Sequence, residues 1–144
     1  MIVVDTGPIF AAAAVNDANH HGCVELFARL RMARRRLLLP TTVAAEVGYL
    51  LMTRLGAGAE VAFAKGVAGG AFDIVDLTRQ DFGRIAELTE RYSDLPLGIT
   101  DASVIALSER LGVVEVATLD RRHFTVVRPR HVGVLTLLPE TPTR

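Results

Sequence analysis

Apolar residues along the chain fall into short unbroken runs and into longer segments with a helical spacing. Residues 2–4 (IVV) and 37–39 (LLL) contain no polar side chain, and turn or helix-breaking residues follow each run. Runs of this kind are typical of strands that are buried on both faces of a parallel sheet. Strands are predicted at residues 2–4, 37–39, 72–75, 113–119 and 132–138.

The longer segments repeat their apolar residues every three or four positions, which is the spacing of a helix with one buried face. Thr41 or Thr42 is expected to cap the second of these helices, and Thr100 the last one. Residues 6–8 (TGP) are expected to form a turn. Helices are predicted at residues 20–34, 42–55, 58–68, 79–92 and 101–111. In the fourth helix the residues expected to face inward are Phe82, Ile85, Ala86, Leu88 and Thr89.

Strands that alternate with helices predict an α/β domain with a central, mostly parallel sheet of about five strands, flanked by helices on both faces. We expect this domain to occupy residues 1–138 and residues 139–144 (PETPTR) to form a flexible tail. A chain of 144 residues is long enough for one such domain with a real core.

Composition narrows the class of protein. Half of the residues are apolar, which excludes general disorder and suggests apolar surface for a partner. The formal net charge is zero, so no long-range field attracts nucleic acid. Cys23 is the only cysteine, which excludes an internal disulfide and a cysteine-based metal site. The apolar run 8–15 resembles part of a signal peptide but has no basic residues before it. We expect a soluble, cytoplasmic protein.

Four acidic residues are expected to meet at one edge of the sheet. Asp5 and Asp120 come at the carboxyl ends of two predicted strands, Asp101 lies in the first turn of a helix, and Glu46 about one turn into another. In parallel α/β sheets these ends share the edge at which ligands bind. Taken singly, the three aspartates are ordinary turn or cap residues. Glu46 is expected on or beside an apolar face, where an unpaired carboxylate is costly.

Four carboxylates in one pocket repel one another and take up protons unless cations are present. A set of oxygen ligands favours Mg²⁺ or Mn²⁺ over zinc. Such ions activate water and stabilise the charge that develops when a phosphodiester is hydrolysed. The acids therefore predict a metal-dependent nuclease.

Four segments carry a resemblance to a known family: IVVDTGPI, TTVAAEVGYLL, PLGITDASVIALSERLG and VATLDRRHF. In this order and spacing they resemble the PIN domain and, more narrowly, the VapC toxin ribonucleases of VapBC toxin–antitoxin pairs. The resemblance extends from residue 1 to about residue 138. It implies that the metal-binding and catalytic acids are Asp5, Glu46, Asp101 and Asp120, with Thr6 and Thr118 supporting them through hydrogen bonds.

The resemblance also implies an activity and partners. It implies an endoribonuclease toxin that cuts structured RNA, such as tRNA or rRNA, with Mg²⁺ or Mn²⁺, forms a homodimer and is inhibited by a small antitoxin protein. Many relatives carry a further Asp three residues before the third acid, where this chain has Gly98. Asp94 is nearby but off register, which implies that a second ion is held weakly or only with RNA bound.

Basic residues provide candidates for RNA binding. Arg121, Arg122 and His123 directly follow Asp120 and are therefore expected to border the pocket and bind phosphate. Residues 34–36 (RRR) either bind RNA or place positive charge at the C-terminal end of the predicted helix 20–34, where the helix dipole favours it.

Two other functions are possible on these residues. One is a catalytically silent PIN-like module that binds RNA or protein, against which the four intact acids argue. The other is an Asp-based phosphotransfer domain. Such a domain needs a second acid near the first Asp and a lysine on a later strand. Here Asp5 stands alone, and Lys65 is in a predicted helix.

Overall fold

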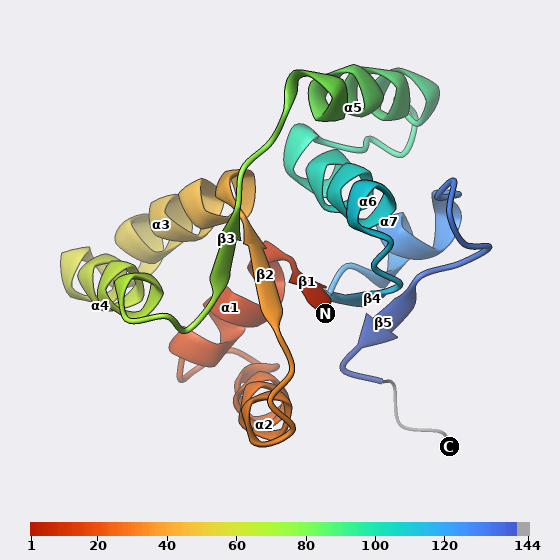
Figure 1. The fold of residues 1–144 in the computed structure, drawn as a ribbon. Coiled ribbons are helices and arrows are strands. Elements are labelled where there is room, and N and C mark those ends of the chain that lie inside the picture. The colour runs from red at the N-terminus through yellow and green to blue at the C-terminus, as the bar shows by residue number, and fades with distance from the viewer. Residues whose placement is uncertain (141–144) are drawn as a thin grey trace.

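The chain forms a five-stranded sheet with the strand order β3-β2-β1-β4-β5, and every neighbouring pair is parallel. It is seen in a computed structural model that describes residues 1–140 (Figure 1). The predicted α/β class with a central, mostly parallel sheet is confirmed. The strands are β1 (Ile2–Val4), β2 (Leu37–Pro40), β3 (Asp73–Val75), β4 (Glu115–Ala117) and β5 (Thr136–Leu138).

Seven helices in residues 1–140 cover this sheet. Figure 1 shows α1 to α4 gathered on one side of the central strands and α5 to α7 on the other. Since β1 lies between β2 and β4, the chain changes direction across the sheet at β1. The helices are α1 (Thr6–Ala13), α2 (His20–Met32), α3 (Thr41–Leu55), α4 (Ala57–Ala68), α5 (Arg79–Arg91), α6 (Ile99–Leu111) and α7 (Arg121–Val126).

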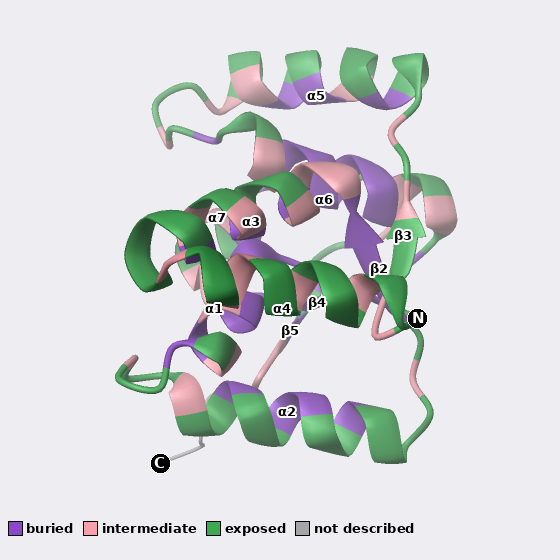
Figure 2. Cartoon of the chain, turned by 90° about the vertical axis from the view of Figure 1, so that its left-hand side faces the viewer, coloured by how far each residue is buried: buried purple, intermediate pink, exposed green. Residues whose placement is uncertain are grey.

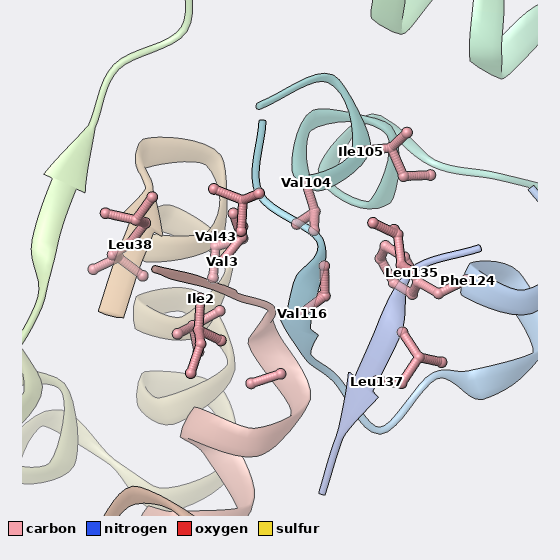
Figure 3. Packing of buried hydrophobic residues seen from close by; sticks show 14 of the residues in the cluster. Ile2, Val3, Leu38, Val43, Val104, Ile105, Val116, Phe124, Leu135 and Leu137 are labelled. Atoms are coloured by element: carbon pink, nitrogen blue, oxygen red, sulfur yellow. The ribbon is translucent and has the colours of Figure 1, made fainter. Parts of the chain in front are cut away.

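The core forms where the central strands meet α3, α6 and α7. The three residues of β1 are fully buried, as is every position of α6 from Ala102 to Ser108, because α6 is covered by the sheet on one side and by α5 on the other. Phe124 of α7 is also fully buried and lies beside Leu135 (Figure 3). Figure 2 shows the outer layers, where α2 and α5 bury only one face and α4 buries no residue.

Two helices were not predicted. Residues 6–8, predicted as a turn, are the first turn of α1, where Pro8 costs no hydrogen bond because the first amides of a helix have no partner within it. Residues 121–126 form α7 after a strand that is shorter than predicted. No helix within residues 1–140 is long and apolar enough to cross a membrane. Residues 141–144 of the predicted tail lie outside the described residues.

The rotation of α5 differs from the prediction. Phe82 is 49% exposed and Ala86 is exposed, whereas Asp81, Ile85 and Leu88 are buried. Asp81 forms a capping box with Thr78 and an ion pair with Arg110 of α6. These contacts hold the face of α5 that carries Asp81 toward α6. The predicted caps were also wrong: α3 begins after Pro40 and α6 after Gly98, so Thr41, Thr42 and Thr100 lie within first turns.

Candidate active site

The carboxyl ends of β1 and β4 bring Asp5 and Asp120 to the same edge of the sheet. The Asp5 amide donates to the Ala117 carbonyl at the end of β4 (2.8 Å), which fixes the first acid beside the neighbouring strand. Gly7 permits this close approach, since a Cβ there would lie 3.3 Å from the Leu119 side chain. Asp101 reaches the same edge from the first turn of α6, and Glu46 from the second turn of α3.

Asp5 is the most deeply buried of the four acids, with 5% of its surface exposed. Loss of hydration on burial raises its pKa to about 6, and the negative charges of Asp101 and Glu46 add to this effect. A hydrogen bond from the Thr118 hydroxyl (2.7 Å) opposes the shift. The burial of Asp5 near two other acids therefore favours either protonation of its carboxylate or a cation bound beside it.

Two threonines hold the acids in place through hydrogen bonds. The Thr118 hydroxyl donates to Asp5 Oδ2 and accepts the Asp120 amide (3.0 Å), so that one side chain orients both strand-end acids. The Thr6 hydroxyl donates to Glu46 Oε2 and thereby joins α1 to α3. Glu46 is exposed, which corrects the expected apolar surroundings, because Val43 and Val47 occupy the buried face of α3.

Asp101, Asp120 and His123 form the tightest cluster at this edge. His123 Nδ1 lies 2.7 Å from Asp120 Oδ2 and 3.0 Å from Asp101 Oδ2. Burial raises the pKa of Asp101, the His123 ring opposes the shift, and the Asp120 carboxylate adds to it. One ligand atom from each of the three residues lies within 4.8 Å of the others, a separation that suits a shared metal ion.

The residues that follow Asp120 point in different directions. Arg121 is half-buried, and its guanidinium donates to the Pro139 carbonyl. Arg122 is exposed. His123 turns back toward the acids because α7 begins directly after Asp120, which places residues 120 and 123 one turn apart. An Asp–x–x–His spacing at a helix start is the signal that sequence reasoning missed.

Residues 34–36 lie at the opposite edge of the sheet. The Arg36 carbonyl accepts the Ile2 amide at the start of β1, and its guanidinium pairs with Asp73 at the start of β3. Arg35 pairs with Glu115 at the start of β4. Of the two interpretations that the sequence left open, these contacts favour a structural role, with the partners of Arg35 and Arg36 at strand starts rather than at the helix end.

Gly98 is the N-cap of α6, with an extended backbone (φ −83°, ψ 172°) and open space around the position of a Cβ. Asp94 lies in the exposed turn before it. The four predicted acids therefore converge without a fifth carboxylate from either position.

Comparison with known proteins identifies the family of this chain. The family model of the PIN domain matches residues 2–128. Ribonuclease VapC26 of Mycobacterium tuberculosis is 30% identical over 138 residues, which cover 96% of this chain and 100% of the relative. The crystal structure of VapC20 of the same organism, a toxin that cleaves the sarcin–ricin loop, has a TM-score of 0.75 at 22% identity and covers 94% of this chain and 99% of its own. With this fold, this cluster of acids and these relatives, the chain belongs to the PIN domain family.

Proposed function

We propose that the protein is a metal-dependent endoribonuclease, the toxin of a type II toxin–antitoxin pair, which hydrolyses a phosphodiester bond in structured RNA. The observation that carries this proposal is the convergence of Asp5, Glu46, Asp101 and Asp120 at the sheet edge where the chain changes direction. Its similarity to a ribonuclease over nearly the whole chain supports the same activity. The similar fold of a toxin that cleaves the sarcin–ricin loop is compatible with the proposed substrate class, rRNA or tRNA.

The four acids fit a divalent ion, either Mg²⁺ or Mn²⁺. Asp5, Asp101, Asp120 and Glu46 would hold it through carboxylate oxygens, and the burial of Asp5 among like charges favours such a counter-ion. When bound, the ion supplies an activated water and stabilises negative charge on the phosphate. Thr118 and Thr6 keep the carboxylates oriented, so that little rearrangement is needed during the reaction.

An anionic RNA backbone must approach these carboxylates, and nearby guanidinium groups reduce the repulsion. We assign phosphate binding to the start of α7, at Arg121, Arg122 and His123. Arg122 is the exposed member of this group, whereas the Arg121 guanidinium is engaged with Pro139 and the His123 ring with the acids. Arg122 is therefore the strongest candidate for a direct contact.

We further propose that the protein acts in the cytoplasm and that its partner there is a small antitoxin. An apolar cavity of about 510 Å³ lies between α1, α2 and α4, with Phe27, Phe63 and Phe72 in its lining and Arg31 among them. A cavity of this kind suits the apolar face of an amphipathic segment. The exposed residues Tyr49 and Met52 on α3 are candidates for the contact between two copies in a homodimer.

The test is cleavage of total cellular RNA by purified protein in Mg²⁺ or Mn²⁺, with the new ends mapped by sequencing. We expect a few discrete sites in tRNA or rRNA that disappear with excess EDTA and with Asp101→Asn. Binding of RNA without cleavage in either metal would favour a silent binding module and overturn the proposal. Cleavage that persists in EDTA would exclude the metal mechanism.

A further inference from the structure

The ring of His123 lies between two of the predicted metal ligands. Its Nδ1 atom is within 3.0 Å of a carboxylate oxygen of Asp101 and of one of Asp120. Ligands that are adjacent around an octahedral ion, each about 2.1 Å from it, are themselves about 3 Å apart. The ring nitrogen is therefore already at the separation of a neighbouring ligand from each of the two oxygens.

The other ring nitrogen has a partner that fixes the orientation of the ring. His123 Nε2 lies 3.3 Å from the Leu95 carbonyl, an acceptor that only a protonated Nε2 can satisfy. A proton on Nε2 leaves Nδ1, the nitrogen that faces the two carboxylates, as the atom that can ligate an ion. A backbone carbonyl bound to the distal nitrogen is the usual outer partner of a histidine that ligates a metal.

The two carboxylate oxygens of Asp120 have different partners, and this difference supports the same site. Its Oδ1 accepts the His123 amide (3.0 Å) as the N-cap of α7, which leaves Oδ2 facing the ring. The cap thus sets the position of His123 relative to Asp120 through the backbone. Only 18% of the His123 side chain is exposed, so the ring is held in this orientation rather than free in solvent.

We infer that His123 is a nitrogen ligand of the metal ion held by Asp101 and Asp120, and that the centre consequently prefers Mn²⁺ to Mg²⁺. The inference rests on the proposed function only in requiring that these acids bind a divalent ion. Mg²⁺ binds oxygen ligands almost exclusively, whereas transition ions such as Mn²⁺ also accept imidazole nitrogen. An all-carboxylate site offers much less discrimination between the two ions.

The alternative is that His123 only donates hydrogen bonds to the carboxylates and leaves when an ion binds. The two roles differ in whether nitrogen is bonded to the ion. Pulsed electron paramagnetic resonance of bound Mn²⁺ detects directly coordinated ¹⁴N, so it separates them without any measurement of RNA cleavage. His123→Gln keeps a polar side chain but removes the ring nitrogen. His131→Gln is the matched control, since His131 Nε2 donates to the Val113 carbonyl outside the acid cluster.

We expect ¹⁴N modulation from Mn²⁺ bound to the wild-type protein and to His131→Gln, and its loss in His123→Gln. Calorimetric titration should show weaker Mn²⁺ binding in His123→Gln by about tenfold or more, with little change for Mg²⁺. Circular dichroism in EDTA checks that each variant is folded. Mn²⁺ bound without nitrogen coupling would overturn the inference and leave the proposed function intact. Absence of binding by either ion would overturn both.

Discussion

The hydroxyl of Thr42 lies 2.6 Å from the hydroxyl of Ser103 and joins α3 to α6, the helices that carry Glu46 and Asp101. Ser103 is fully buried and donates its own proton to the Thr100 carbonyl (2.7 Å), so that Thr42 is the donor in the pair. This contact fixes the spacing of two helix starts at the edge where the acids meet.

Removing the Thr42 hydroxyl should therefore shift Glu46 and Asp101 relative to each other while leaving all four acids in the protein. Thr42→Val is expected to lower stability by about 1 kcal/mol and to lower kcat for RNA cleavage more than it changes KM. Thr42→Ser keeps the donor and should restore kcat. Equal kcat in the valine and serine variants at saturating metal would show that the contact has no role in positioning the acids.

Loss of one carboxylate should separate activity from stability. Asp101→Asn is expected to abolish RNA cleavage and to raise the metal-free melting temperature, because burial and Asp120 disfavour the charged form of Asp101. Thermal melts in EDTA and a cleavage assay on the same samples check both parts. A variant that unfolds at a lower temperature than the wild type would contradict the view that like-charge repulsion is relieved.

The raised pKa of Asp5 predicts a pH dependence of metal-free stability. The folded protein retains the Asp5 proton up to about pH 6, whereas the unfolded chain releases it near the ordinary value of 3.8. Since the folded state binds more protons in this window, stability falls as the pH rises through it, by a total on the order of 3 kcal/mol. Denaturant melts in EDTA from about pH 4 to about pH 7 should show a shallower decline in Asp5→Asn than in the wild type. Parallel profiles would assign the dependence to other groups.

RNA affinity should depend on Arg122 through phosphate contact. In the inactive Asp101→Asn background, Arg122→Ala is expected to weaken RNA binding and to flatten the slope of log K against log salt by about 0.7 to 0.9. Arg34→Ala is the matched control, because Arg34 is exposed and follows α2 at the opposite edge of the sheet. If the two variants lose equal affinity for RNA, the RNA-binding residues are spread over the surface rather than concentrated at α7.

A carboxylate added at Gly98 should strengthen metal binding. The backbone there accepts any residue and the space around a Cβ is open, so Gly98→Asp should fold normally, with a melting temperature close to that of the wild type. Gly83→Asp adds the same charge to the exposed face of α5 and serves as the control. Calorimetry should show tighter Mg²⁺ or Mn²⁺ binding in Gly98→Asp alone. No difference between the two variants would place residue 98 outside the metal site.

The amino-acid sequence by itself determined the parallel α/β class and the edge at which the acids gather. Both follow from local patterns, since an unbroken apolar run indicates a buried strand and Asp5 and Asp120 are adjacent to such runs. Strand ends and helix starts share one edge in every parallel α/β sheet, so the location of the acids needed no further information.

Only the tertiary structure decided the partners of individual side chains. Helix α1 has no polar face because α2 and α3 pack against it, so its sequence lacked the periodicity that marks a helix. The orientation of α5 came from the ion pair between Asp81 and Arg110. His123 meets Asp101, distant in sequence, because α7 turns it back across the edge beside α6. These contacts depend on how elements pack, a property that no local pattern of residues contains.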